Sequence, residues 1–164
     1  AAKINSPNKA DKLIIQLCLL RDLFSFTVKY KEFLEKLKLF TIDGVDVKKI
    51  VLSFCEISSM PITDSDIRRL SLRMPLHLYC FVHLCASKAL GETGSWVTDV
   101  WNRGKNLGCL FSEIKPLLMG QHLIDLGLPQ GKRIGEICKA VFELQLDGKI
   151  NTVEEAIAEA KKLL

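Results

Sequence analysis

Three glycines near the end of the chain, Gly127, Gly131 and Gly135, recur at every fourth position, and Lys132 and Arg133 follow the second of them. A helix that begins at Gly131 points its first N–H groups outward without intrahelical partners. Such a helix end binds anions, and two adjacent cations strengthen the attraction. The pattern therefore predicts a contact to a phosphate backbone that is independent of nucleotide sequence. The alternative is a helix hairpin that needs glycine only for its turns.

The glycines of this segment also have expected structural roles. Gly127 suits the C′ position of a short helix, where a positive φ is required. Gly120 and Gly135 permit close packing or the close approach of another backbone. We therefore expect Gly120 and Gly127 to shape the turn, whereas Gly131, Gly135 and the two cations contact phosphate.

Further cations that could bind phosphate lie upstream in the chain. They are Arg68, Arg69, Arg73, Arg103 and Lys105. Arg69 and Arg73 are spaced to share one helix face, and guanidinium groups bind phosphate oxygens as planar forks. The alternative for this set is solvated charge, paired with acidic residues such as Asp64 and Asp66.

A cluster of histidine and cysteine invites a metal hypothesis, which the spacing does not support. His77, Cys80, His83 and Cys85 do not share one helix face, and no second ligand pair follows at zinc-finger spacing. They are interpreted as core residues of a buried helix. Motifs of hydrolases, P-loop proteins, zinc proteases and dinucleotide-binding folds are missing. We expect no catalytic residue, cofactor or metal in this chain alone.

The composition is that of a globular protein with a mildly basic balance. The chain has 164 residues, 48% hydrophobic and 26% charged, with a formal net charge of +4. Residues 1–119 contain 17 Lys and Arg against 12 Asp and Glu, whereas residues 120–164 contain 6 against 7. A bound polyanion should therefore contact both regions.

Cysteine usage and hydropathy indicate a cytoplasmic protein. Six cysteines lie mostly in apolar runs without a CxxC pair, which predicts buried, reduced thiols. A signal peptide and an apolar run of ~18 residues, the minimum for a membrane span, are both missing. The chain starts with Ala-Ala-Lys rather than Met, so we expect a fragment of a longer protein.

Apolar periodicity and capping residues predict an all-α fold and no strand. Expected helices cover about 6–24, 27–40, 46–57, 63–73, 75–90, 95–114, 121–126, 132–146 and 152–164. The first begins at Ser6-Pro7, the fourth at Thr63 and the last at Thr152. We expect a helical body over 1–115 and a tail domain over 116–164 that contains the glycine-spaced hairpin.

The tail resembles a known family. The run 116–137 (PLLMGQHLIDLGLPQGKRIGEI) is similar to the tail motif of bacterial-type CCA-adding tRNA nucleotidyltransferases and related poly(A) polymerases. That motif reads Gly-x-Asp-Leu-x-x-Leu-Gly-x-x-Pro-Gly-x-x-hydrophobic-Gly. The run 144–157 (LQLDGKINTVEEAI) resembles the ending of the same family, so about fifty residues match. His122 stands where the family usually has Asp, and Pro129-Gln130 inverts the order before Gly131.

The resemblance implies that the chain is the tRNA-binding C-terminal portion of such an enzyme. It would position tRNA for 3′-end addition by an N-terminal catalytic head, which would hold the Mg²⁺ and the CTP or ATP. The chain alone would be inactive, and its partners would be tRNA and its own head domain, with no membrane. Two other hypotheses remain, a helix-hairpin-helix DNA-binding module and a helical protein-interaction domain. Their affinities for tRNA and for duplex DNA distinguish the three.

Overall fold

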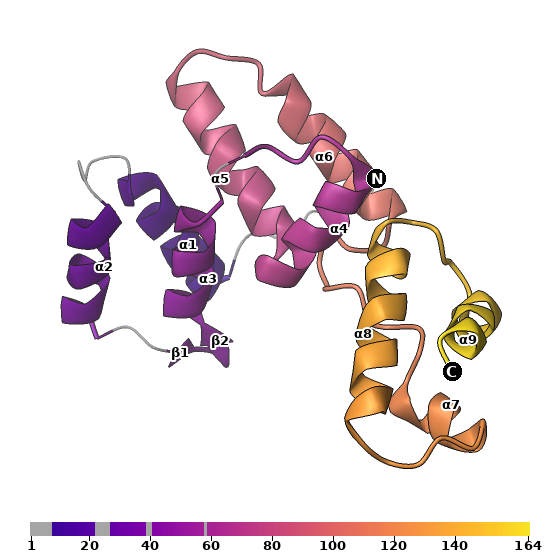
Figure 1. Ribbon diagram of the computed structural model, residues 1–164. Coiled ribbons are helices and arrows are strands. Elements are labelled where there is room, and N and C mark those ends of the chain that lie inside the picture. The colour runs from indigo at the N-terminus through magenta and orange to yellow at the C-terminus, as the bar shows by residue number, and fades with distance from the viewer. Residues whose placement is uncertain (1–7, 22–26, 39–40, 58) are drawn as a thin grey trace.

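The computed structural model describes residues 8–21, 27–38, 41–57 and 59–164, and in these the fold is all-α, as predicted. The helices are α1 (Lys9–Leu20), α2 (Thr27–Lys36), α3 (Val47–Cys55), α4 (Asp64–Arg73), α5 (Leu76–Ala89), α6 (Ser95–Asn106), α7 (Gly120–Asp125), α8 (Lys132–Leu146) and α9 (Val153–Lys162). Figure 1 shows α1–α6 on one side and α7–α9 on the other, with α8 next to α4. None of the helices in the described ranges has the length and apolar character that a bilayer span requires.

A small β-hairpin precedes α3 and corrects the expectation of no strand. Strands β1 (Thr41–Ile42) and β2 (Val45–Asp46) pair antiparallel. Asp43 and Gly44 between them have φ of +50° and +79°. Positive φ at both central positions is typical of a tight hairpin turn, and Asp-Gly is its usual sequence. That dipeptide was the available signal for the hairpin.

Two helices end earlier than predicted. α6 ends at Asn106 rather than near Ile114 because Gly108 takes a φ of +70° and the Cys109 N–H donates to the Gly104 carbonyl at 2.9 Å. Leu110, which the predicted helix includes, lies instead in the connecting segment after α6, and its side chain is buried. α2 ends at Lys36 because Leu37 and Lys38 form a turn in which Lys38 has a φ of +51°, so the predicted continuation toward 40 is wrong at 37 and 38. α1 begins at Lys9, after the extended N-cap Asn8, rather than at Ser6-Pro7. The predicted end of that helix at 24 lies outside the described residues.

The body has one hydrophobic core, with α5 at its centre. α5 packs against both α1 and α6, and it buries Leu76, Leu78 and Tyr79 completely or nearly so. Gly104 of α6 lies directly on this core, because a Cβ there would approach Leu76 Cδ2 to 2.3 Å. Close helix packing, rather than a ligand, therefore explains the glycine beside Arg103.

The tail has its own core, which shares no buried residue with that of the body. It consists of Leu118, Leu123, Ile137, Val141, Ile150, Ala156 and Ala160. The core of the body ends in sequence at Leu110, so the connecting segment 107–119 joins two separate apolar clusters. The predicted boundary at 115/116 lies within this segment.

Candidate nucleic-acid interface

The turn between α7 and α8 is held by glycine. Gly127 follows α7 with a φ of +91°, and its N–H donates to the Ile124 carbonyl at 2.8 Å. The Leu128 N–H donates to the Leu123 carbonyl at 3.0 Å. These two bonds form a Schellman motif, which requires a left-handed residue at the C′ position. Gly127 therefore has the structural role expected of it.

The start of α7 packs closely against α8. A Cβ on Gly120 would lie 3.2 Å from Ile134 Cγ2, so Gly120 permits this approach. His122, one of the departures from the family motif, accepts a hydrogen bond at Nδ1 from the Met119 N–H at 3.2 Å. Its imidazole therefore caps the helix as a carboxylate would, and the departure leaves the turn intact.

Gly131 and Gly135, in contrast, lie in open space. A Cβ on either residue would meet no heavy atom within 4 Å. Gly131 has an extended backbone with a φ of 169°, which any residue adopts, and Gly135 lies inside α8. A glycine inside a helix costs ~0.5–1 kcal/mol relative to alanine. The packing of the fold requires neither glycine, so the close-packing interpretation of Gly135 is not supported.

The first turn of α8 presents its amides and two cations to solvent. Gly131 provides no side-chain cap, and the side chains of Lys132 and Arg133 are 93% and 63% exposed. Glu136 lies 3.9 Å from both cations and partly offsets their charge. Arg133 Nη2 also donates to the Leu163 carbonyl at 2.7 Å, which ties the end of α9 to this surface.

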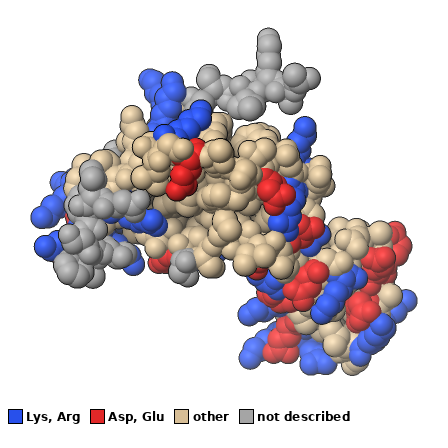
Figure 2. Space-filling view, turned by 90° about the horizontal axis from the view of Figure 1, so that it is seen from above, with Lys and Arg blue, Asp and Glu red and all other residues tan. Residues whose placement is uncertain are grey.

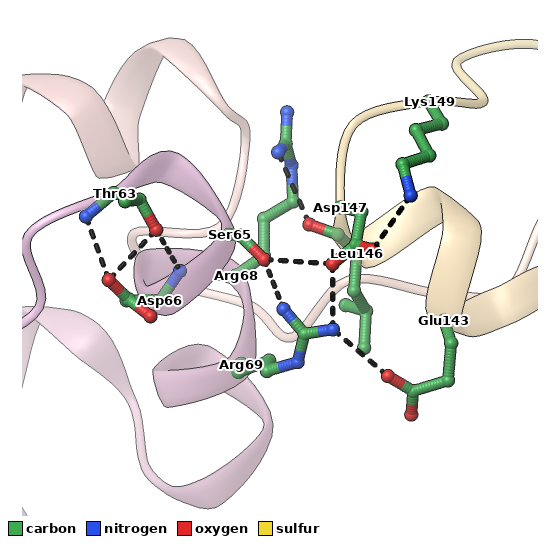
Figure 3. Close-up of polar contacts among 9 residues, drawn as sticks. All are labelled: Thr63, Ser65, Asp66, Arg68, Arg69, Glu143, Leu146, Asp147 and Lys149. Atoms are coloured by element: carbon green, nitrogen blue, oxygen red, sulfur yellow. Dashed lines mark hydrogen bonds and ion pairs between the residues drawn. The ribbon is translucent and has the colours of Figure 1, made fainter.

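Arg69 is not a free phosphate ligand, because its guanidinium joins the body to the tail. Its Nη2 donates to Glu143 Oε2 at 3.0 Å and to Asp147 Oδ1 at 2.8 Å, and both acceptors belong to the end of α8 (Figure 3). Ser65 also donates to Asp147 at 3.2 Å. The hydrogen bond from Arg69 holds the pKa of the Asp147 carboxyl below its usual value, so this ion pair persists to a lower pH than an unpaired aspartate would remain charged.

Arg68 lies across the end of α8. Its Nη1 donates to the Leu146 carbonyl at 3.3 Å and is 2.9 Å from the position of a Cβ on Gly148. A cation at a helix C-terminus interacts favourably with the helix dipole. The negative charges of Glu143 and Asp147 interact unfavourably with the negative end of the helix dipole. This unfavourable placement is visible in the sequence and indicates that a cation from another element binds there. Sequence reasoning missed both acceptors.

The remaining upstream cations differ in their contacts. Arg103 donates through Nε to Asp64 at 2.8 Å and through Nη1 to the Ile62 carbonyl at 2.9 Å. Arg103 is therefore paired with Asp64, as in the alternative interpretation of the upstream cations. Arg73 is exposed, with a distant carboxylate of Glu56 at 3.8 Å. Lys105 is exposed and has no ion pair within the described ranges.

The two predicted groups of cations do not come together. Lys132 and Arg133 begin α8, whereas Arg68 and Arg69 contact its end. At 1.5 Å per residue, Glu143 and Leu146 lie roughly 15–21 Å along the helix from Lys132 and Arg133. Figure 2 shows Lys and Arg next to Asp and Glu over the tail, while the visible face of the body has few charged side chains. A phosphate contact on this surface would therefore be local.

The expectation that the histidines and cysteines of α5 are all core residues is wrong for Cys85, which is exposed, whereas His83 lies among aromatic rings. Tyr79 and Trp96 surround His83 with ring centroids 4.4 and 5.0 Å away. Burial lowers the pKa of His77 and raises that of Cys80 to about 12, so both side chains are neutral at pH 7. In the described part of the chain the six cysteines are free thiols, and no three His, Cys, Asp or Glu side chains are grouped to hold a metal.

The junction between body and tail yields a prediction at Gly148. This residue has a φ of +75°, so Gly148→Ala introduces backbone strain of ~1–2 kcal/mol. The new Cβ also displaces Arg68 from the Leu146 carbonyl, which adds the loss of a hydrogen bond, about 0.5–1.5 kcal/mol. Chemical denaturation followed by tail amide signals should show the summed decrease in the free energy of unfolding.

The matched control is Gly127→Ala in the same tail. Gly127 has a φ of +91° and nothing within 4 Å of a Cβ, so this variant has the strain without the displaced arginine. Equal losses for the two variants would mean that the contact of Arg68 with the end of α8 contributes nothing.

No protein-family model, curated protein or solved structure matches the chain.

Proposed function

We propose that this chain is the tRNA-binding body and tail of a tRNA nucleotidyltransferase, of the type that adds CCA or poly(A) to RNA 3′ ends. In this proposal the tail grips the phosphate backbone, and a catalytic head of the parent protein adds the nucleotides. Mg²⁺ and the CTP or ATP bind to that head. The chain alone is inactive. It binds tRNA in the cytoplasm, where tRNA 3′ ends are repaired.

The observation that carries the proposal is the open space around Gly131 and Gly135. Both glycines flank Lys132 and Arg133, and a Cβ on either would meet no other part of the fold within 4 Å. A bare backbone at a helix N-terminus allows a phosphate to reach the amide groups directly. Such contacts involve phosphate oxygens rather than base edges, so they suit a protein that handles many tRNA sequences. The resemblance of the run 116–137 to the family tail motif supports the same function.

The proposed contacts fall into two ranks. The principal phosphate contact has its backbone and charge exposed to solvent and consists of Gly131, Lys132, Arg133 and Gly135. Exposed Arg73 and Lys105 can extend the footprint over the body. Arg69 and Arg103 already bind carboxylates of this chain, so they maintain the fold rather than hold RNA.

Gly135→Ala tests the proposal because it separates stability from binding. The substitution should raise the free energy of unfolding by about 0.5–1 kcal/mol, since alanine favours the helix and the site has room for a Cβ. The same Cβ would keep a phosphate from the amides. Because each charge-assisted hydrogen bond contributes about 1.5–3 kcal/mol, tRNA affinity should fall roughly tenfold or more. Thermal melting and filter binding measure the two effects.

Ala140→Gly, at an exposed position of the same helix, is the opposite control. It should lower stability by a similar amount and leave tRNA affinity unchanged. A Gly135→Ala variant that binds tRNA as tightly as the parent chain would refute the role of the open glycines.

A further inference from the structure

A cleft of about 520 Å³ lies between the body and the tail. The body contributes Arg68 and Asn106 to its walls, the tail contributes Asn151, and Ser112 and Lys115 lie in the segment that connects them. In Figure 1 this segment passes between the end of α6 and α8. A group bound in the cleft would therefore touch both the body and the tail.

The position of the connecting segment is fixed by one side chain of α8. Gln145 Oε1 accepts from the Leu117 N–H at 3.0 Å, and Gln145 Nε2 donates to the Lys115 carbonyl at 3.0 Å. Both ends of this amide are satisfied by the backbone, so Gln145 holds Lys115 at the edge of the cleft. The wall of the cleft is thus built before any ligand arrives.

The walls are rich in hydrogen-bond donors that the protein does not use. Arg68 has five N–H donors, of which one binds the Leu146 carbonyl, and no described carboxylate lies within ion-pair distance of it. Lys115, Asn106 and Ser112 have no side-chain hydrogen bond within the described ranges. Glu113 is the acidic residue of the lining. Two cations against one carboxylate leave the cleft positive.

We propose that this cleft binds a phosphate group. An arginine fork and a lysine at its rim match the charge and geometry of phosphate oxygens. An amide and a hydroxyl beside them supply further neutral donors. The inference rests on the proposed function, which makes the RNA backbone the source of the phosphate. A free nucleotide would supply the same phosphate chemistry. Bound phosphate would link body and tail at the end of α8 opposite Lys132.

The experiment is an NMR titration of the whole chain labelled with ¹⁵N. Inorganic phosphate, adenosine 5′-monophosphate and tRNA are added in separate arms, and amide shifts are followed at Asn106, Ser112 and Asn151. Lys115→Gln removes an exposed cation without breaking any hydrogen bond of its side chain. Lys88→Gln makes the same change at the far end of α5 and serves as the control.

We expect phosphate to shift the amides that line the cleft, and Lys115→Gln to weaken its binding about fivefold, as for loss of one charge contact in water. Lys88→Gln should have no effect. If the nucleoside monophosphate binds in the cleft and tRNA does not, the free nucleotide is the source. Cleft amides that do not move with any of the three ligands, or a Lys115→Gln chain that binds like the parent, would overturn the proposal.

The outcomes separate this inference from the proposed function. If tRNA shifts only the amides at 131–135, and neither phosphate nor the nucleoside monophosphate shifts the cleft amides, the tail contact stands and the cleft is not a phosphate site. If tRNA does not bind anywhere while phosphate still moves the cleft amides, the proposed function fails and the cleft remains an anion site.

Discussion

Leu123→Ala is expected to unfold the tail and leave the body folded. Leu123 is fully buried in the tail core and its carbonyl also accepts the Leu128 N–H that closes the turn. Truncation of a buried leucine to alanine costs about 2–5 kcal/mol. At about 0.05–0.15 kcal/mol per residue, a unit the size of the tail is stable by only ~2–7 kcal/mol. The loss is therefore comparable to the whole stability of the tail.

Hydrogen exchange measured residue by residue would detect this separation. Protection should fall in α7, α8 and α9, while amides of α5 keep theirs, because the two apolar clusters share no buried residue. Leu90→Ala, at a side chain that is 75% exposed, is the control and should change neither unit. Equal loss of protection in body and tail would show that the contacts of Arg68 and Arg69 with the end of α8 couple the two cores into one cooperative unit.

Lys132→Glu is expected to weaken tRNA binding more than any other single change of a side chain on the surface. The Lys132 side chain is 93% exposed at the start of α8, so its reversal should not disturb the fold. Removal of one phosphate contact reduces the salt slope by about 1, and the new carboxylate adds repulsion of the phosphate backbone. We expect a loss of roughly tenfold to a hundredfold in affinity at low salt.

The control for this variant is Lys12→Glu, an equal change of charge on α1. Lys12 is exposed and lies near the N-terminus of its helix, where a carboxylate is favourable. Both variants change the net charge equally, so a general electrostatic effect would weaken tRNA binding by the same factor. Such an equal loss would argue against a specific contact at Lys132.

Local signals in the sequence were sufficient to predict where several helices begin and end. Thr63 with Asp66 and Thr152 with Glu155 form the capping boxes that start α4 and α9. Both follow from interactions between residues three apart, which the sequence displays directly. The Schellman turn at Gly127 is local in the same sense. These features need no knowledge of tertiary contacts.

Other features depended on distant contacts and were missed. Arg69 finds its carboxylates more than seventy residues away, on α8. α6 stops at Asn106 because Gly108 turns the chain so that Cys109 and Leu110 reach the body core. Apolar periodicity continued through this region and could not distinguish a helix from a buried loop. The roles of Gly120 and Gly135 likewise differ only because Ile134 packs against the former.

The central claim is that the chain binds tRNA through its phosphates, and the affinity for tRNA over a range of salt concentrations tests it most directly. We predict measurable binding at low salt, a linear decrease of log K with log salt, and weaker binding to duplex DNA under the same conditions. Tighter binding to duplex DNA would indicate a helix-hairpin-helix module instead. Negligible affinity for tRNA even at low salt would contradict the claim and leave a protein-interaction domain as the remaining hypothesis.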